Sequence, residues 1–424
     1  MSKRVLLIAF HFPPQAASSG IQRTLSFSKH LSDSGWEPMV LSAHPRAYSQ
    51  QNTSQLASIP SKVLVRRAFA LDAKHHLGYK GRYLALTALP DRWTSWAVGA
   101  IPAGLALIRK HRPQVIWSTF PISTAHLIGL ALHRLTGLPW VADFRDPMLQ
   151  PSYPVLPLQR SLYRWIERQT IQHCDTAVFT THSAMADYCR RFPEICASKF
   201  RVIENGYDDD SFGSDMPAAS ATPAPAAGRP LTLLHSGVLY QDGRDPAPFL
   251  QAVGRLKAQG LATPASLRVV LRAPGDLAAT QACVDTAGVS DLVEVAPPVP
   301  YGEAVREMLD ADGLMVFQGS PFNNQIPAKV YEYFRARKPI IGLLDPLGET
   351  ARVLGKAGFN DIAHIDSPEH IATVLQQFLD GVKQGSASVA SDELIRSASR
   401  QYRAGELALV LDAASSRAQE AKAA

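Results

Sequence analysis

A lysine and a glutamate three residues apart, Lys329 and Glu332, follow a proline in the segment NNQIPAKVYEYFRARKP, residues 323–339. Pro327 fits the first turn of a helix, where its missing N–H costs nothing, so we expect a helix to begin there. Side chains three positions apart on a helix are neighbours, so both could meet one ligand. The helix start favours an anion, which Lys329 would reinforce, and the Glu332 carboxylate can accept hydrogen bonds from two vicinal hydroxyls. The spacing therefore predicts a site for a ribose diphosphate, with an ordinary amphipathic helix and a surface ion pair as the alternative.

A second group of candidate residues lies in LLHSGVLYQDGRDP, residues 233–246. Ser236 and Gly237 follow a predicted strand there, and Arg244 stands just ahead of a predicted helix. An arginine can bind two oxygens of a diphosphate at once. We therefore expect Arg244 to clamp a diphosphate, and the alternative is a surface arginine on a turn.

Charged residues also follow a predicted strand in the first half of the chain. The sequence DFRDP places Asp143, Arg145 and Asp146 directly after the strand predicted at 139–142. A parallel strand delivers such side chains to the edge of the sheet where ligands bind. Carboxylates there could bind an acceptor hydroxyl or take its proton, and Arg145 could orient one of them or meet a phosphate. A purely structural Asp–Arg pair is the alternative.

A run of small residues, from Ala16 to Gly20, leads from the first predicted strand into a helix. Without bulky side chains, the backbone N–H groups could approach a phosphate or a sugar closely. The alternative is an ordinary loop between a strand and a helix.

Neither metal nor disulfide chemistry is indicated. Two Asp-x-Asp spacings, at 208–210 and 310–312, could suggest a metal that binds phosphate, but the first lies beside a linker and the second at a helix end. We therefore expect metal-independent chemistry. The four cysteines show no CxxC spacing, so neither a zinc site nor a disulfide framework is predicted, and a reducing cytoplasm fits.

The elements that must position these residues follow from a repeated pattern. Short apolar runs such as RVLLIAF, QVIWST and PWVAD alternate with helical patterns over residues 1–213, which predicts a parallel sheet covered on both faces. Residues 214–230 are rich in Ala, Pro and Ser and indicate a linker. The alternation returns over 231–384, and 385–424 indicates a helical tail. We therefore expect an α/β protein with two Rossmann-like, doubly wound domains that face each other across a cleft.

The length and the charge of the chain limit which classes of binding partner it can have. The chain has 424 residues, 46% hydrophobic and 19% charged, which fits two globular domains. The formal charge is +10 over residues 1–212, from 24 basic and 14 acidic side chains, and −4 over 213–424, from 19 and 23. A basic half fits an anionic membrane surface or a phosphate-bearing substrate, with a merely solvated surface as the alternative. The absence of a nucleic-acid-binding motif argues against nucleic acid, and the absence of GxGxxG argues against a nicotinamide dehydrogenase.

Five motifs occur in an order that resembles a known family. The segments FPP…SGIQRTLSFSKHL, DFRD, VIENGYD, HSG…GRDP and IPAKVYEYFRARKP together resemble the retaining glycosyltransferases of the GT4 family, which have the GT-B fold. The match covers nearly the whole chain and is most similar to bacterial enzymes of exopolysaccharide and lipopolysaccharide biosynthesis. It implies no cofactor, a second domain that binds a nucleoside diphosphate sugar with UDP or GDP as the nucleotide, and a first domain that binds a glycan or a polyprenyl-diphosphate-linked acceptor.

The resemblance also assigns roles to individual residues. Glu332 matches the second glutamate of the family's E-x7-E motif, which holds the donor ribose, and Lys329 and Arg244 are similar in placement to its diphosphate-binding residues. The first glutamate of that motif is Asn324 here, and many members carry a histidine where this chain has Thr119. The implied reaction is transfer with retention by front-face attack, in which the leaving phosphate helps to deprotonate the acceptor.

The candidate residues thus form three groups. The catalytic group is Arg145 and Asp146, and the acceptor-binding group is Thr119 and Asp143. The donor-binding group is Gly20, Ser236, Gly237, Arg244, Asn324, Lys329 and Glu332. Two other functions would share the fold, namely a non-hydrolysing sugar-nucleotide epimerase and a sugar-nucleotide-binding protein that has lost catalysis.

A segment of the first domain suggests contact with a membrane. Residues 79–101 interleave aromatic and basic side chains, which suits an interface with anionic lipid, although the aromatics could instead pack in the core. These side chains are Tyr79, Tyr83, Trp93 and Trp96 with Lys80, Arg82 and Arg92. No run is long enough to span a membrane, and the apolar stretch at the start is shorter than that of a signal peptide. We therefore expect a cytoplasmic protein that can associate with the inner face of the plasma membrane.

Overall fold

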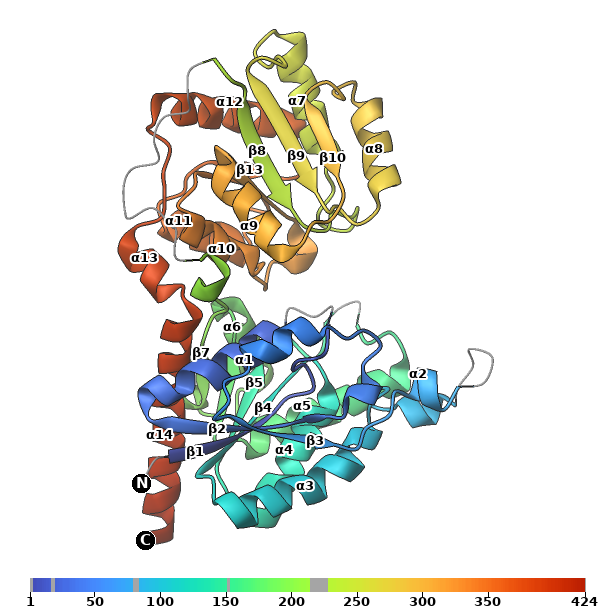
Figure 1. The fold of residues 1–424 in the computed structure, drawn as a ribbon, viewed down its shortest axis with the longest axis vertical. Coiled ribbons are helices and arrows are strands. Elements are labelled where there is room, and N and C mark those ends of the chain that lie inside the picture. Colours follow the sequence, from blue (N-terminus) through green and yellow to red (C-terminus); the bar gives the residue numbers. More distant parts are fainter. Residues whose placement is uncertain (1–2, 17–19, 79–83, 151–152, 214–227, 424) are drawn as a thin grey trace. The chain divides into compact units, whose positions relative to one another are not determined.

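The chain folds into two compact units. The computed structural model describes residues 3–16, 20–78, 84–150, 153–213 and 228–423. The first unit consists of Met1–Asn205 together with Arg400–Ala424, and the second consists of Gly206–Ser399 (Figure 1). The predicted linker, 214–230, lies almost entirely outside the described residues. The expected cleft between the two domains stays a prediction.

The first unit is built on a seven-stranded parallel sheet with the order β3-β2-β1-β4-β5-β6-β7. Its strands are β1 (Lys3–Ile8), β2 (Trp36–Ala43), β3 (Leu64–Ala68), β4 (Val115–Thr119), β5 (Trp140–Phe144), β6 (Thr176–Phe179) and β7 (Phe200–Val202). In register, Leu7 of β1 lies between Val40 of β2 and Trp117 of β4. All three side chains are fully buried, as expected for a parallel sheet covered on both faces.

The helices of the first unit cover both faces of this sheet. They are α1 (Gly20–His30), α2 (Ala73–His76), α3 (Ser95–His111), α4 (Ser123–Thr136), α5 (Pro157–His173), α6 (His182–Arg191) and α14 (Arg400–Ala423). The predicted tail includes α14, which runs beside this sheet (Figure 1). The reason lies in its sequence: Ala404, Leu407, Ala408 and Leu411 recur at helical spacing and are buried in the same core as Leu7.

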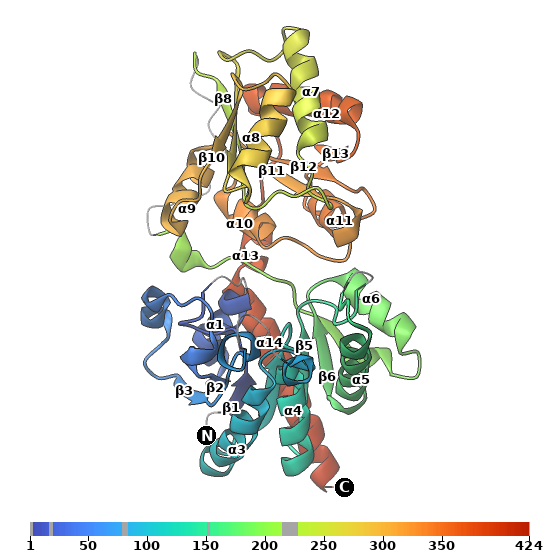
Figure 2. The ribbon, with the colours of Figure 1, turned by 90° about the vertical axis from the view of Figure 1, so that its right-hand side faces the viewer.

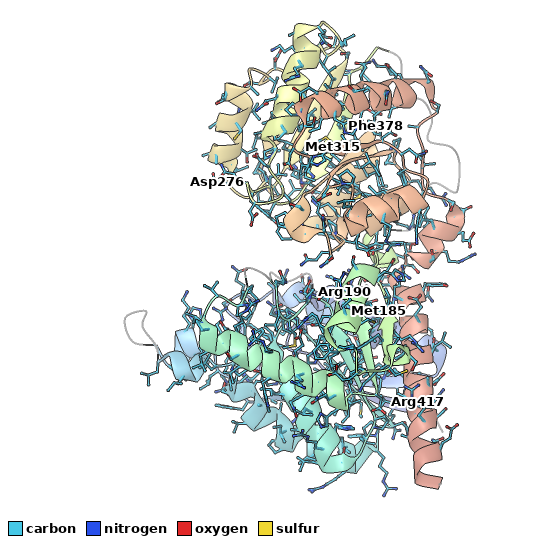
Figure 3. All side chains as sticks on the ribbon, turned by 180° about the vertical axis from the view of Figure 1, so that it is seen from behind. Met185, Arg190, Asp276, Met315, Phe378 and Arg417 are labelled. Atoms are coloured by element: carbon cyan, nitrogen blue, oxygen red, sulfur yellow. The ribbon has the colours of Figure 1, made fainter. Side chains whose placement is uncertain are left out.

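The second unit is built on a six-stranded parallel sheet with the order β10-β9-β8-β11-β12-β13. Its strands are β8 (Leu231–Ser236), β9 (Leu267–Arg272), β10 (Val293–Ala296), β11 (Gly313–Gln318), β12 (Ile340–Leu344) and β13 (Ile362–His364). Its helices, shown in Figure 2, are α7 (Ala247–Ala258), α8 (Leu277–Thr286), α9 (Tyr301–Asp310), α10 (Lys329–Ala336), α11 (Glu349–Lys356), α12 (Pro368–Gln384) and α13 (Asp392–Ser397). Met315 of β11 and Phe378 of α12, labelled in Figure 3, pack in one of its cores. The expected pair of parallel, doubly wound domains is therefore confirmed.

The helix predicted at Pro327 begins two residues later, at Lys329. Ala328 occupies the N-cap position and offers no side-chain acceptor. Val330, Tyr333 and Phe334 form the buried stripe of this helix. The buried stripe fixes which face of α10 packs on the sheet, so Lys329 and Glu332 are left on a less buried face.

Candidate functional site

The candidate donor site lies where the strand order of the second sheet reverses. From β8 the chain proceeds to β9 on one side, whereas β11, which pairs with the other side of β8, leads on to β12. In open parallel sheets, ligands bind beyond the carboxyl ends of the strands at such a point. Here those ends are Ser236 of β8 and Gln318 of β11.

Lys329 reaches back from α10 to the end of β8. Its Nζ donates a hydrogen bond to the carbonyl oxygen of Ser236 at 2.6 Å and lies 3.4 Å from Nε2 of His235. Gly237 has φ of +131°, and a Cβ atom built there would lie 2.6 Å from the Lys329 Nζ. The backbone angle therefore favours glycine, and any larger residue would displace the Lys329 amine from this position. The structure thus brings together three residues that the sequence predicted for one site.

His235 was not predicted from the sequence, although it directly precedes Ser236. Its side chain is buried, and Nδ1 lies 3.0 Å from the Met315 carbonyl oxygen. Burial, and then the charge of Lys329, hold the pKa of His235 well below its usual value. The neutral ring therefore donates a hydrogen bond from Nδ1 to the Met315 carbonyl oxygen, and its Nε2 can accept a hydrogen bond from the Lys329 ammonium group.

The residue Lys329 is only partly buried, but the amine at the end of its side chain is desolvated. Desolvation and the neighbouring charge of Arg244 lower the pKa of Lys329 to about 7, with a smaller opposing effect from Glu332. A lysine with such a pKa is only partly protonated at neutral pH. Binding of an anion beside it favours the protonated form, so the lysine becomes fully charged.

Arg244 is held beside this lysine by two aromatic rings. Its guanidinium carbon lies 5.3 Å from the ring centre of Tyr240 and 5.6 Å from that of Phe322. Its Nε is buried without a hydrogen-bond partner among the described residues. Stacking fixes the plane of the guanidinium and leaves its N–H groups to donate. This arrangement suits an anion such as a diphosphate.

The loop after β11 carries Asn324. Gln318, which the sequence analysis missed, donates from Nε2 to the carbonyl oxygens of Phe322 at 2.6 Å and Gln325 at 2.7 Å. A buried amide therefore shapes the loop from inside. Asn324 itself is exposed on this loop, whereas Asn323 donates to Asp345 at 2.9 Å.

Glu332 lies one turn along α10 from Lys329. Its Oε1 accepts a hydrogen bond from the hydroxyl of Tyr301 at 2.8 Å. Tyr301 is the first residue of α9 and was also missed by the sequence analysis. The contact orients a carboxylate that can accept further hydrogen bonds.

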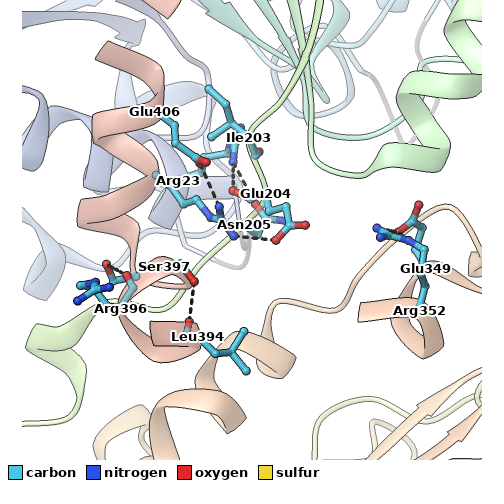
Figure 4. A network of polar contacts seen from close by, with 12 residues as sticks. Arg23, Ile203, Glu204, Asn205, Glu349, Arg352, Leu394, Arg396, Ser397 and Glu406 are labelled. Atoms are coloured by element: carbon cyan, nitrogen blue, oxygen red, sulfur yellow. Dashed lines mark hydrogen bonds and ion pairs between the residues drawn. The ribbon is translucent and has the colours of Figure 1, made fainter. Parts of the chain in front are cut away.

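In the first unit, Asp143 at the end of β5 is fully buried. It forms a bidentate ion pair with Arg23 of α1, with Nη2 2.7 Å from Oδ1 and Nε 3.1 Å from Oδ2. Thr119, at the end of β4, donates to the same carboxylate at 2.7 Å. The two predicted acceptor residues therefore meet, but the carboxylate is occupied by Arg23. The same arginine also donates to the carbonyl oxygens of Ile203 and Glu204 (Figure 4). In this structure, Asp143 holds α1 against the segment after β7.

Arg145 and Asp146 also meet, as predicted. The Arg145 guanidinium donates to Oδ2 of Asp146 from Nε at 3.1 Å and from Nη2 at 3.0 Å. Its Nη1 is buried without a hydrogen-bond partner among the described residues. A Cβ atom at Gly20 would lie 1.9 Å from that Nη1, so any side chain at this position would displace the guanidinium from where it lies. Burial, and then the charge of Arg145, lower the pKa of the nearby His11 to about 3.

Part of the predicted membrane segment is accounted for by packing. Trp96 is fully buried in a core of the first unit, and Trp93 packs against that core with Arg92 stacked 4.3 Å from its ring centre. The remaining aromatic residues of the segment, Tyr79 and Tyr83, lie outside the described residues. Two of the four aromatics therefore have a structural role. None of the helices in the described parts of the chain is both long and apolar enough to cross a membrane.

Comparison with known proteins finds one matching family model and many similar solved structures. Residues 20–206 match the family model of a glycosyl transferase 4-like domain. A sequence comparison with curated proteins finds no match. Several solved structures resemble the chain over nearly its whole length. The fold is GT-B.

Three of these structures illustrate the likeness. The N-terminal domain of Candida albicans trehalose-6-phosphate phosphatase has a TM-score of 0.65 at 12% identity, covering 98% of this chain and 97% of its own. HepE of Anabaena, solved with UDP and glucose, has a TM-score of 0.63 at 12% identity, covering 97% and 100%. The lipopolysaccharide outer core galactosyltransferase WaaB has a TM-score of 0.62 at 11% identity, covering 96% and 99%. Identities this low show a shared fold.

Proposed function

We propose that this GT-B protein is a glycosyltransferase that moves a sugar from a nucleoside diphosphate sugar to a glycan or lipid-linked acceptor. The observation that carries the proposal is the meeting of Lys329, Gly237 and Arg244 at the switch point of the second sheet. One amine and one stacked guanidinium there suit the two phosphates of a nucleotide. The match of residues 20–206 to a glycosyl transferase 4-like domain supports the same reaction class.

The donor would be bound in two parts. Lys329 and Arg244 would bind the diphosphate, and Glu332, oriented by Tyr301, would accept hydrogen bonds from the ribose hydroxyls. Asn324 would lie at the sugar, where the resembling family carries a glutamate. UDP is the first nucleotide to test, because the similar HepE structure was solved with UDP and glucose.

The chemistry would retain the configuration at the anomeric carbon and would need no metal. The bond from that carbon to the diphosphate oxygen breaks as the acceptor oxygen attacks from the same face, and the leaving phosphate takes the acceptor proton. Lys329 and Arg244 would stabilise the negative charge that grows on the leaving diphosphate. Asp146, oriented by Arg145, would position the acceptor hydroxyl. We further propose a cytoplasmic role in cell-surface polysaccharide synthesis, as the resemblance implies.

A thermal-shift panel tests the donor site. UDP, GDP, ADP and their sugars would be compared on the native chain, on Glu332→Ala and on Glu393→Ala, whose exposed glutamate in α13 lies outside the site. A ligand that binds only the folded state raises the melting temperature. We expect one nucleotide to shift the native chain and the Glu393 control equally, with a reduced shift for Glu332→Ala. No shift with any nucleotide would overturn the donor site.

A turnover assay then separates transfer from the alternatives. Release of free nucleotide from the nucleotide sugar that binds, in the presence of a glycan acceptor, would indicate a transferase, and proton NMR of the product would give its anomeric configuration. Interconversion of the donor without an acceptor would indicate an epimerase. Binding without either reaction would indicate that the protein has lost catalysis.

A further inference from the structure

A cluster of exposed apolar side chains lies on α5 and on the segment before it. Of the 21 large hydrophobic side chains exposed among the described residues, five fall between residues 153 and 165, each with at least 45% of its surface exposed. They are Tyr153, Val155, Leu156, Leu158 and Trp165. Single exposed apolar residues are ordinary, whereas a cluster of this kind marks an interaction surface.

The register of α5 places apolar and basic residues on one outward face. Leu158, Trp165 and Arg168 are separated by seven and three positions, so they share a face, and Arg164 lies beside them. The only acidic residue of the helix, Glu167, is fully buried. We refer to residues 153–158 with Arg164, Trp165 and Arg168 as the α5 surface. It is apolar and cationic, without an acidic side chain.

The two arginines of the α5 surface are available for a ligand. The side chains of Arg164 and Arg168 form no hydrogen bond or ion pair in the part of the chain that the structure describes. They line a cavity of about 420 Å³ together with Arg191 and Glu194. Glu167 also lines it, but its carboxylate is already bound by Arg191 and by the hydroxyl of Tyr188. The cavity therefore keeps a positive character that fits a phosphate group.

The apolar residues are exposed although their backbone is held in place. Nη1 of Arg160 donates to the carbonyl oxygens of Gln150 at 2.8 Å and Tyr153 at 3.2 Å. Gln159 donates to the carbonyl oxygen of Pro90 at 2.9 Å. These bonds fix the start of α5 on the first unit. Val155 and Leu156 are therefore exposed on a segment whose backbone is held in place by hydrogen bonds.

We propose that the α5 surface docks the first unit onto an anionic lipid bilayer. Leucine, valine and tryptophan side chains enter the boundary between headgroups and acyl chains, while Arg164 and Arg168 bind lipid phosphates. Charge complementarity favours the bilayer as the partner. The unpaired arginines match the anionic headgroups, and the exposed apolar side chains on the same face match the acyl chains below them. The proposal goes beyond the proposed function, since it involves no residue of the nucleotide or acceptor sites.

Sedimentation with vesicles tests the proposal on the full chain. The protein is mixed with vesicles of phosphatidylcholine alone and of equal parts phosphatidylcholine and phosphatidylglycerol. We expect binding to the mixed vesicles that weakens with salt, and much weaker binding to phosphatidylcholine. Arg164→Gln with Arg168→Gln should lower partitioning onto the mixed vesicles by about tenfold or more. Leu156→Ser with Leu158→Ser should lower it by about tenfold as well.

Matched controls come from the second unit. Leu347→Ser removes a more exposed leucine, and Lys356→Gln with Lys383→Gln removes two exposed lysines. Both should bind vesicles like the native chain. Melting curves establish that each variant is folded. Equal binding by the α5 variants and the native chain, or no binding of the native chain to either vesicle, overturns the proposal, as does equal binding to both lipids.

Fluorescence gives a second readout that locates the contact. Of the six tryptophans, Trp36, Trp96, Trp117 and Trp140 are fully buried, whereas Trp165 is exposed. Transfer of Trp165 into the bilayer boundary should shift the emission to shorter wavelength. Trp165→Phe should abolish that shift while the protein still sediments with the mixed vesicles. A shift that persists in Trp165→Phe would show that the contact lies elsewhere. Binding of a protein partner without any binding to vesicles would show that the α5 surface recognises a protein and not a bilayer.

Discussion

The hydroxyl of Tyr301 donates a hydrogen bond to Oε1 of Glu332 at a distance of 2.8 Å. The two residues belong to different helices, α9 and α10, so the carboxylate is oriented by a neighbour that is distant in sequence. A carboxylate can accept several hydrogen bonds at once. The tyrosine therefore restricts the side chain of Glu332 and leaves it able to accept from a ligand.

Removal of this hydroxyl should weaken nucleotide binding through Glu332. We expect Tyr301→Phe to lower the affinity for UDP by about fivefold, from about 1 kcal/mol for one hydrogen bond, and Glu332→Ala to lower it further. Titration calorimetry with UDP and with 2′,3′-dideoxy-UDP measures both effects. The dideoxy compound lacks the hydroxyls that Glu332 is proposed to hold. Its affinity should therefore be the same for the native chain and Tyr301→Phe, and an equal loss for both nucleotides would contradict the proposed contact.

The affinity for a nucleoside diphosphate should depend on pH through Lys329. Its pKa is lowered to about 7, so the ligand-free lysine loses its proton as the pH rises above that value. A bound diphosphate favours the charged form and raises the pKa again. Affinity should therefore be nearly constant just below pH 7 and fall by up to about tenfold for each pH unit above it. Binding at higher pH should take up a proton.

Calorimetry in two buffers with different ionisation enthalpies measures that proton uptake. The terminal phosphate of the nucleotide titrates near pH 6, so measurements between about pH 7 and pH 9 report the protein. Lys329→Met should bind more weakly and show no proton uptake. Affinity that stays constant across this range in the native chain would show that Lys329 does not titrate on binding.

Gly237→Ala should disturb the position of Lys329. The new Cβ would lie 2.6 Å from Nζ, and φ of +131° is unfavourable for alanine, so the lysine would be displaced from the Ser236 carbonyl. We expect UDP affinity to fall by about tenfold or more in calorimetry. Gly288→Ala is the matched control, because it also has positive φ but no atom within 4 Å of its Cβ. A comparable loss of affinity in both variants would point to general destabilisation.

Much of the second unit's site followed from the sequence because its residues lie close to predicted strand ends. Ser236 ends β8, Gly237 follows it, and Lys329 begins the helix after β11, so the order of strands and helices alone brings them near one another. The contacts of Gln318 and Tyr301 could not be predicted in this way. Gln318 looks like one more polar residue at a strand end, and only the folded loop shows which carbonyl oxygens it reaches.

Other features depend on contacts between distant parts of the chain. Arg23 reads as a surface arginine on a helix, yet it is buried against Asp143, 120 positions away. The helical tail was recognised, but its place on the first sheet depends on the fit of Leu407 and Leu411 to that core. Trp96 was considered for a membrane surface and is a core residue, because composition alone cannot distinguish these two uses.

The buried ion pair between Arg23 and Asp143 should be essential for the stability of the first unit. Asp143→Asn removes the charge that compensates a buried guanidinium, and breaking such a pair typically costs about 3–5 kcal/mol. All six tryptophans lie in the first unit, so tryptophan fluorescence during urea unfolding follows this unit specifically.

Glu37→Gln is the matched control, because Glu37 pairs with Arg4 in the same unit where both side chains are substantially exposed. An exposed pair contributes about 0–1 kcal/mol, so the control should unfold close to the native midpoint. The double variant Arg23→Met with Asp143→Asn should be less destabilised than the sum of its single variants, since no uncompensated charge is left buried. Additive effects would show that the two side chains stabilise the unit independently, through contacts such as those of Arg23 with the Ile203 and Glu204 carbonyl oxygens.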